Sequence, residues 1–289
     1  MKEIVVLSGK GGTGKTSLTA ALAWVADQEL VVADCDVDAA NLHLLLDPRI
    51  KESVDFFSGE LAVIQPDLCT QCGLCAEVCR FAAITVRDSR HQVQGLDCEG
   101  CGYCARICPE QAIKMHSRKT GQILLSLSRT GCGMVHARME AGAGNSGKLV
   151  ARVKQEARQM ASTTGAELVL IDGAPGLSCP VISSLAGADY VLVVVEPTVS
   201  SLHDLSRLYD VIRGFDIPLG AVINKSDLNP RVAIELKSFF GDHAINFLTT
   251  IPYDEQISAA LSEGKTIAEI NPHYVALIRD IWTGLCKTL

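Results

Sequence analysis

The chain has 289 residues, of which 48% are hydrophobic and 20% charged, so it has enough apolar side chains for a packed core and is not a disordered chain. Its 26 basic and 33 acidic residues give a formal net charge of −7, so a broad basic surface for nucleic acid is not expected. The longest apolar runs, such as Val191–Val195, are too short to span a membrane, and Met1–Glu3 leads straight into a strand-like segment rather than a signal peptide. We therefore expect a cytoplasmic protein.

The first predicted elements are a buried strand at Ile4–Leu7 and a helix at Ser17–Asp27, with a glycine-rich loop between them. The loop fits the P-loop pattern G-x-x-x-x-G-K-[ST], and the strand–loop–helix context disfavours a chance match. Inward-facing N–H groups and the start of the helix attract phosphate. The predicted nucleotide-binding residues are Gly11, Gly12, Thr13, Gly14, Lys15, Thr16 and Ser17. Lys15 is expected to reach the β- and γ-phosphates, and Thr16 to ligate Mg²⁺.

The next predicted strand, at residues 30–34, ends in two carboxylates, Asp34 and Asp36. Acidic side chains at the carboxyl end of a strand suit Mg²⁺ binding and the positioning of an attacking water. An ordinary turn at the end of the strand is the alternative interpretation.

Eight of the 12 cysteines form two runs with the spacing C-x2-C-x2-C-x3-C. The first run is Cys69, Cys72, Cys75 and Cys79, and the second is Cys98, Cys101, Cys104 and Cys108. The second run repeats the first after 29 residues, which indicates an internal repeat. Gly73 and Gly102 follow the second cysteine of each run, where such a loop bends.

This spacing is typical of ferredoxins with two [4Fe–4S] clusters, in which the last cysteine of each run ligates the other cluster. We assign Cys69, Cys72, Cys75 and Cys108 to one cluster, and Cys98, Cys101, Cys104 and Cys79 to the other. Zinc sites usually pair two C-x2-C hooks across a long gap, and disulfides are typical of secreted chains, so both alternatives fit poorly. One departure is Arg80, which follows Cys79 where a ferredoxin run usually has proline.

After the cysteine runs, Gln122–Ser128 is interpreted as a returning strand, and a helix is predicted from Leu149 to about Ser162. Further strands are expected at residues 167–171, 190–195, 219–223 and 247–251. Strands that alternate with helices predict an α/β fold with a doubly wound, mostly parallel sheet that binds its ligand at the carboxyl ends of the strands. The predicted ATPase domain comprises 1–65 and 117–289, and the predicted ferredoxin module, 66–116, is inserted into it.

Three segments together resemble the deviant Walker A superfamily of P-loop ATPases, which includes MinD, Mrp and the nitrogenase iron protein. They are the loop with its early Lys10, the acidic pair at Asp34 and Asp36, and Asp172-Gly173-Ala174-Pro175-Gly176 after an apolar strand. The whole chain resembles members of this superfamily that carry an inserted two-cluster ferredoxin domain.

The resemblance implies roles for single residues. Lys10 would cross a dimer interface to contact the partner's nucleotide, and a solvated loop lysine is the alternative. Asp36 would orient the attacking water, with Asp34 near the metal, and Asp172 would hold Mg²⁺ through water. Gly176 would read the γ-phosphate through its N–H. Asn224 and Pro252 would line the base pocket, and a turn residue is the alternative for Asn224.

Four cysteines lie outside the two runs. Cys35 and Cys286 are interpreted as small buried hydrophobes. Cys179 lies seven residues after Asp172, where the nitrogenase iron protein has a cluster ligand, and with Cys132 it is a candidate for a third cluster that bridges two subunits. Structural or redox-inert cysteines are the alternative. The C-terminal helix at about 272–287 has few basic residues, so we expect it to pack on the core rather than bind a membrane.

The sequence thus predicts an ATPase, slow and stimulated by a partner, whose nucleotide-dependent dimerisation is coupled to electron transfer through two [4Fe–4S] clusters. The expected cofactors are ATP, Mg²⁺ and the two clusters. The expected partners are a second copy or a paralogue, together with a redox or iron–sulfur protein, but neither nucleic acid nor a membrane. An iron–sulfur assembly or carrier ATPase, and a positioning ATPase with a redox-sensing module, are the alternatives.

Overall fold

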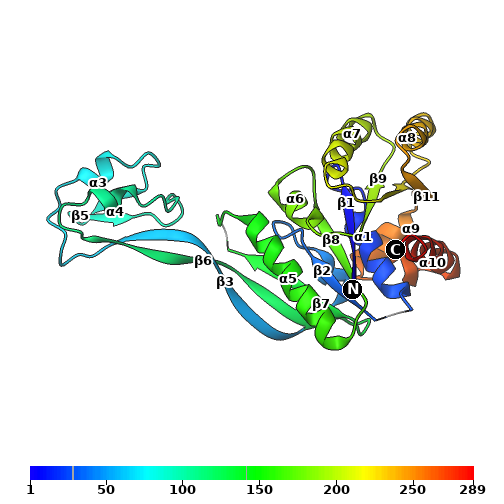
Figure 1. Cartoon of the computed structure of the whole chain (residues 1–289), viewed down its shortest axis with the longest axis horizontal. Helices are drawn as coiled ribbons and strands as arrows, with labels where there is room; N and C mark the ends of the chain where they lie inside the picture. The colour runs from blue at the N-terminus through cyan, green and yellow to red at the C-terminus, as the bar shows by residue number, and fades with distance from the viewer. Residues whose placement is uncertain (28, 141) are drawn as a thin grey trace. The chain divides into compact units, whose positions relative to one another are not determined.

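The computed structural model describes residues 1–27, 29–140 and 142–289, which form two compact units. The first, here called the P-loop unit, comprises Met1–Val54, Ile123–Arg138 and Ser146–Leu289. The second, here called the cysteine unit, comprises Asp55–Gln122 and Met139–Asn145. Figure 1 shows the elements of both units.

The P-loop unit is built on a sheet whose described strands have the order β11-β10-β9-β1-β8-β2-β7-β6-β3. The strands from β11 to β7 pair in parallel, as the alternation of strands and helices predicts. Their bounds are β1 Lys2–Ser8, β2 Leu30–Asp34, β7 Gly133–Met139, β8 Leu168–Pro175, β9 Tyr190–Val195, β10 Leu219–Asn224 and β11 Asn246–Ile251. The prediction of a mostly parallel α/β sheet is confirmed.

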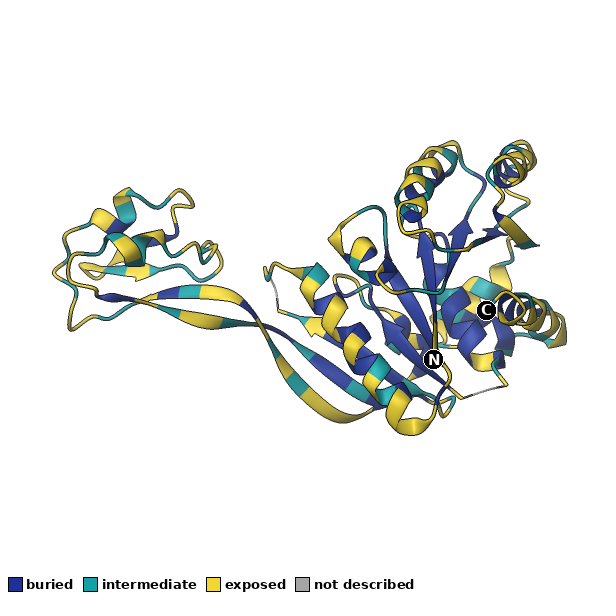
Figure 2. Ribbon diagram, viewed as in Figure 1, coloured by how far each residue is buried: buried dark blue, intermediate teal, exposed yellow. Residues whose placement is uncertain are grey.

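Helices cover both faces of this sheet (Figure 1). On one face, α1 (Lys15–Val25) and α10 (Pro272–Cys286) pack against alternate residues of the central strands, such as Ile4 and Val32. On the other face, α5 (Ser146–Thr164) lies against β2 and β8. Figure 2 shows the central strands buried throughout, which explains why they are continuous apolar runs. The other helices are α2 Leu42–Leu46, α6 Cys179–Leu185, α7 Val199–Arg213, α8 Pro230–Asp242, α9 Glu255–Ser262 and a 3₁₀ turn at Ile267–Glu269.

The C-terminal helix α10 packs on the core, as predicted, through one stripe of buried residues: Tyr274, Ile278, Ile281, Trp282 and Leu285. The prediction that Cys286 is buried is wrong, because it is exposed. One helical residue advances about 100° around the axis, so Cys286 turns away from the stripe that contains Leu285.

Two long strands, β3 (Arg49–Ile64) and β6 (Ile113–Leu127), belong to both units. The sequence predicted only the end of β6, at residues 122–128, and missed β3. Most residues of β3 are exposed, so the strand carries no apolar run and little alternation that could reveal it.

The cysteine unit has an internal repeat in its backbone as well as in its sequence. Its elements are α3 (Leu74–Glu77), α4 (Tyr103–Ile107) and a hairpin of β4 (Ile84–Arg87) with β5 (Arg90–Val93). Positive φ angles recur 29 residues apart, at Gln71 and Gly100, Gly73 and Gly102, and Ala82 and Gln111. The N–H of Gln65 donates to the carbonyl of Ala112, and that of Gln94 donates to the carbonyl of Ala83, each at 2.7 Å. Each half of the repeat therefore bonds to the other in the same way.

Candidate nucleotide pocket and cysteine cavities

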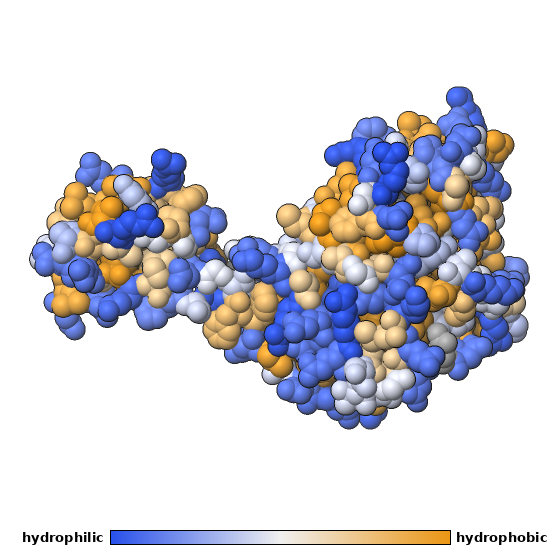
Figure 3. All heavy atoms as spheres, in the orientation of Figure 1, coloured by the Kyte–Doolittle hydropathy of each residue, from blue (hydrophilic) through white to orange (hydrophobic). Residues whose placement is uncertain are grey.

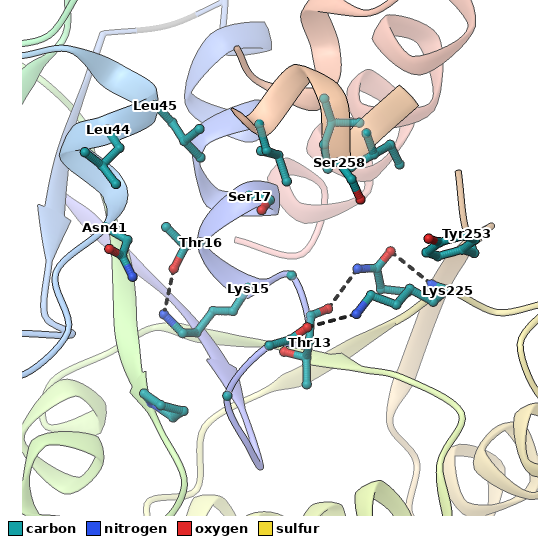
Figure 4. A pocket seen from close by; sticks show the side chains of 18 of the residues that line it. Thr13, Lys15, Thr16, Ser17, Asn41, Leu44, Leu45, Lys225, Tyr253 and Ser258 are labelled. Carbon is teal, nitrogen blue, oxygen red and sulfur yellow. Dashed lines mark hydrogen bonds between the residues drawn. The ribbon is translucent and has the colours of Figure 1, made fainter. Parts of the chain in front are cut away.

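A pocket of about 570 Å³ opens at the carboxyl ends of the parallel strands in the P-loop unit. All seven predicted loop residues line it, together with Asp36, Asn224 and Pro252. Figure 4 shows Lys15 and Thr16 at one part of the pocket, with Leu44, Leu45 and Ser258 facing it from other elements. The structure thus brings the predicted loop, acidic and base-side residues together in one place.

At the floor of the pocket, Lys15 and Thr16 both bind the fully buried Asp172, which lies within β8. The Lys15 amine lies 2.8 Å from Asp172 Oδ1, and the Thr16 hydroxyl donates to Oδ2 at 2.7 Å. Burial lowers the pKa of Lys15, but the carboxylate of Asp172 outweighs this, so the net pKa is raised. A charged lysine, a hydroxyl and a carboxylate in contact are the groups that bind phosphate and Mg²⁺.

The two acids at the end of β2, Asp34 in the strand and Asp36 just after it, occupy different positions. Asp36 lines the pocket, with Oδ2 at 3.7 Å from the Lys15 amine. Asp34 is fully buried beneath it, and its carboxylate accepts the N–H groups of Asp36 and Leu42, each at 3.2 Å. Burial, with the nearby charge of Asp172, raises the pKa of Asp34 to about 8. Asp34 therefore shapes the loop that presents Asp36.

The loop is tied to the end of β10 by Asn224, whose side-chain amide donates to the carbonyl of Thr13 at 2.8 Å. Gly14 adopts φ of 92°, and a Cβ there would collide with the same amide nitrogen. Only glycine fits this combination of backbone and neighbour. The amide predicted to contact the base thus also holds the phosphate loop.

The wall above the loop is mostly apolar. Its side chains come from three separate segments: Leu44, Leu45, Tyr253, Ile257, Leu261 and Ile267. The flat ring of a nucleotide base can pack against such an apolar wall. Sequence reasoning missed most of these residues, because they come from short elements whose apolar side chains could equally have packed into the core.

Lys10 does not line the pocket, but contacts its own chain at the start of α7. Its amine lies 2.6 Å from Glu196 Oε1, 3.0 Å from the Thr198 hydroxyl and 3.3 Å from the Ser200 hydroxyl. Glu196 Oε2 accepts from Lys225 at 3.1 Å, and Lys225 also donates to the carbonyl of Gly12 at 3.0 Å. Burial alone would raise the pKa of Glu196, but the two lysines hold it below its ordinary value. Lys225 was not among the predicted site residues.

Gly176 does not line the pocket either. It lies in the loop after β8, with φ of 84°, and its N–H donates to the carbonyl of Ser8 at 2.9 Å. The N–H predicted to read a γ-phosphate is therefore used within the chain.

The eight run cysteines divide into two sets of four around two cavities of the cysteine unit. Cys79, Cys98, Cys101 and Cys104 line a cavity of about 360 Å³. Cys69, Cys72, Cys75 and Cys108 line a narrow gap of about 20 Å³. Each set combines three cysteines of one run with the last of the other. The gap is too small for a cluster, so its four side chains would have to move apart to admit one.

Among the described residues, no group of three or more His, Cys, Asp or Glu side chains stands close enough together to hold a metal ion. In a [4Fe–4S] cube each cysteine binds a different iron, so the four sulfurs lie farther apart than the ligands of one ion. Cys72 and Cys101, at equivalent positions of the two runs, are the exposed members of their sets.

The two candidates for a third cluster, Cys132 and Cys179, do not lie together in the chain. Cys132 precedes β7, whose first residue, Gly133, pairs with Val31 near the start of β2. Cys179 follows the far end of β8, which begins beside Leu30 and runs to Pro175. Eight strand residues span about 25 Å, so within one chain the two cysteines lie at opposite ends of the parallel strands, too far apart to ligate one cluster together. Cys132 instead lies 3.0 Å from the hydroxyl of Ser128.

None of the described helices is both long and apolar enough to cross a membrane.

A family model for the CobQ/CobB/MinD/ParA nucleotide binding domain matches residues 4–267. The chain belongs to this family. As a member, it is a nucleotide-binding P-loop protein of the MinD/ParA type, and the 570 Å³ pocket lies where the shared loop is.

Two relatives from Methanocaldococcus jannaschii are similar over nearly their whole length. The uncharacterized protein MJ0578 is 33% identical over 285 residues, covering 98% of this chain and 96% of that protein. The uncharacterized protein MJ0579 is 26% identical, covering 94% and 93%. The septum site-determining protein MinD from Pyrococcus horikoshii OT3, solved as a complex with Mg-ADP, superposes with a TM-score of 0.57 at 17% identity, covering 100% of this chain and 98% of that one. This last likeness shows the fold.

Proposed function

We propose that this chain is an ATPase in which nucleotide-dependent dimerisation is coupled to electron transfer through two [4Fe–4S] clusters. The observation that carries the proposal is the division of the eight run cysteines into two cavities, each lined by three cysteines of one run and the last of the other. Such three-plus-one sets are the ligand pattern of two-cluster ferredoxins. They occur in the same chain as a P-loop pocket.

The floor of the nucleotide pocket fits a magnesium nucleotide. The Thr16 hydroxyl and the Asp172 carboxylate are the oxygen ligands that Mg²⁺ prefers, and they lie 2.7 Å apart. Bound Mg²⁺ would neutralise phosphate charge. Lys15 would exchange its contact with Asp172 for the β- and γ-phosphates, and Asp36 would orient the attacking water. The MinD relative solved with Mg-ADP supports this choice of ligand.

The chemistry of the cysteine unit fits iron–sulfur clusters better than zinc or disulfides. All eight thiols face the two cavities, and the repeated positive φ angles bend each loop around three of them. The bound clusters would supply one-electron carriers. Cys72 and Cys101 are exposed, so an electron partner would approach each cluster closely on that side.

Dimerisation is the step by which nucleotide would control these clusters. Lys10 is directed away from its own pocket, on a rim with the exposed Val199. Released from its contacts with its own chain, Lys10 would reach the phosphates of a second chain and stabilise developing charge there. The second chain is a copy or a paralogue, and the two M. jannaschii relatives are consistent with paralogous pairs in one organism.

The first experiment counts iron and sulfide in the anaerobically purified chain. We expect about eight iron atoms per chain, two clusters of four. Cys108→Ser is expected to lower the content of the cluster bound by Cys69, Cys72 and Cys75, although it lies in the other run. Cys286→Ser, at an exposed cysteine outside both cavities, is the matched control and should keep all eight. If Cys108→Ser instead loses the cluster bound by Cys98, Cys101 and Cys104, then the last cysteine of the second run does not ligate the cluster of the first run.

The second experiment tests coupling. Mg-ATP is added to the loaded chain while cluster potential and cluster transfer to an apo-acceptor are followed together. A shift in potential without transfer supports redox gating, and transfer without a shift supports a carrier ATPase instead. If neither responds to ATP, the coupling proposal is wrong and a sensing role gains support.

A further inference from the structure

Glu196 stands between two lysines at the rim of the nucleotide pocket, and nothing in the catalytic chemistry requires it. One carboxylate oxygen binds Lys10 and the other binds Lys225. Thr198 and Ser200 complete a set of three acceptors around the Lys10 amine. Glu196 follows β9 directly and is mostly buried, so its position is fixed by the sheet.

The same carboxylate is joined to the phosphate loop by two routes. Lys225 reaches from the end of β10 to the carbonyl of Gly12, inside the loop. Lys10 is part of the loop, and the Ser8 hydroxyl donates to its carbonyl at 2.8 Å. Gly9, between them, packs so closely on α7 that a Cβ there would lie 2.7 Å from Asp204 Cβ. The loop, the start of α7 and the end of β10 are therefore held together around Glu196.

Lys10 remains partly accessible in this arrangement. Its side chain is 28% exposed, and the adjacent Val199, the first residue of α7, is 78% exposed. An amine held by three acceptors of its own chain must leave them before it can bind a phosphate of another chain. The free energy of the contacts with Glu196, Thr198 and Ser200 therefore opposes any such transfer.

We propose that Glu196 holds Lys10 on its own chain, and so sets the nucleotide and protein concentrations at which two chains associate. The contacts of Lys10 with Glu196, Thr198 and Ser200 are here called the latch. The latch rests on the proposed nucleotide-dependent dimer and adds its regulation. Glu196 is a positioning residue, since it acts through Lys10 and Lys225. Breaking the latch favours association because the amine is released in advance.

The size of the effect follows from the kind of contact. A partly exposed ion pair changes an equilibrium by up to about fivefold, and about threefold is expected for each latch. A symmetric dimer opens two latches, so Glu196→Gln should lower the dimer Kd by about tenfold. Glu235→Gln is the matched control, because it removes one acid and one exposed ion pair with Arg231 on α8. It should leave the Kd unchanged.

The experiment measures self-association of the full chain by light scattering, with Mg²⁺ and a non-hydrolysable ATP analogue, over a range of protein concentrations. The gain from Glu196→Gln should vanish in a Lys10→Gln background, and this double-mutant cycle separates the latch from a general change in surface charge. Lys225→Gln removes the amine that joins Glu196 to the carbonyl of Gly12 in the phosphate loop, and should weaken nucleotide binding instead. If Glu196→Gln leaves the Kd unchanged or raises it, the latch is wrong.

A second readout does not depend on dimerisation. In the monomer, an amine-reactive ester should label Lys10 about threefold faster in Glu196→Gln than in the wild type, measured by mass spectrometry against the exposed Lys287. Unchanged labelling would show that Glu196 does not hold Lys10. A wild-type chain that binds the analogue and stays monomeric at every concentration would contradict the proposed dimerisation, and with it the regulatory role of Glu196, whatever the labelling rate.

Discussion

The two units of this chain hold their candidate ligand-binding residues in place by different means. In the P-loop unit, the residues follow buried parallel strands, and Asp172 and Asp34 have no exposed surface. In the cysteine unit, the buried apolar cluster of the described residues has four members, Ala62, Cys75, Ile84 and Ile113, and four further cysteines and some of their neighbours pack against it only partly buried. The buried sheet holds the residues of the nucleotide pocket in place, whereas cysteines make up much of the interior of the cysteine unit.

The surface of the cysteine unit also reflects its small core. In the cysteine unit, large apolar side chains next to cysteines are exposed, among them Leu74, Phe81 and Tyr103. Apolar patches break the polar surface of this unit in Figure 3. So few buried residues supply little hydrophobic free energy, and small units with a core this small are commonly stabilised by cross-links or metals. The comparison predicts that the two units respond differently to the same perturbation.

Removal of iron is expected to have the largest effect. An iron chelator under reducing conditions should abolish the amide hydrogen-exchange protection of residues 66–116, since the clusters would supply most of the interior of the cysteine unit. The strands β1, β8 and β9 should keep their protection, because their core contains no run cysteine. Hydrogen exchange read by mass spectrometry measures both at once. Persistent protection of 66–116 would mean that the cysteine unit is stable through its protein contacts alone.

The buried ion pair of the P-loop unit predicts the next largest effect. Lys15→Met leaves the fully buried Asp172 without its cation, and breaking such a pair costs about 3 to 5 kcal/mol of unfolding free energy. Adding Asp172→Asn to the same chain should recover part of this, because the uncompensated charge is removed. Both tryptophans, Trp24 and Trp282, lie in the P-loop unit, so urea titration followed by fluorescence reports on this unit. Equal stability of the two variants would contradict the pair's role.

The phosphate loop has two glycines that differ both in backbone conformation and in their neighbours, because Gly14 has a positive φ and Gly11 does not. Gly14→Ala forces a side chain into φ of 92° and against Asn224, which is expected to cost about 1 to 3 kcal/mol. Gly11→Ala is the matched control, because no atom lies within 4 Å of its Cβ position. The control should change unfolding free energy by less than about 0.5 kcal/mol. The same fluorescence titration measures both, and a large cost at Gly11 would mean that the loop is more tightly packed than this structure has it.

Sequence reasoning identified the parts of the fold that carry strong local signals. The buried strands of the P-loop unit are continuous apolar runs, and the loop at Gly9–Thr16 has a specific pattern, so their place in a parallel sheet could be inferred. The strand β3 could not, because most of its residues are exposed and its pairing with a distant strand leaves no local pattern.

Contacts between segments far apart in the chain explain the remaining differences at the site. The amide of Asn224 binds a loop carbonyl 211 residues away, and Lys10 binds Glu196 and Thr198 across a similar separation. Side chains at the ends of strands could be placed near one another from topology alone, but not paired. Cys179 was a candidate ligand because it lies seven residues after Asp172, with Cys132 as its possible partner, and only the register of β2, β7 and β8 shows that they lie apart.

A smaller effect is expected at His136, a buried residue of β7 whose Nε2 lies 3.1 Å from the Ser126 hydroxyl. Burial, with the nearby His43 and Arg138, lowers its pKa to about 4. In the unfolded chain the pKa is about 6.5, so between pH 6.5 and 4 the unfolded state binds one more proton. Stability is therefore lost as pH falls through this window, and His136 contributes no pH dependence above it.

Between pH 7 and 5 this one histidine should reduce the unfolding free energy by about 2 kcal/mol. Comparing wild type with His136→Gln isolates the effect, because every other titrating group is shared. His203→Gln, at an exposed histidine on α7, is the matched control and should keep the wild-type pH dependence. Since His136 belongs to the P-loop unit, the tryptophan fluorescence should report this loss, while at each pH the hydrogen-exchange protection of residues 66–116 should be the same in wild type and His136→Gln. If His136→Gln keeps the full pH dependence of the wild type, then the loss of stability of the P-loop unit at low pH comes from other groups and not from the burial of neutral His136.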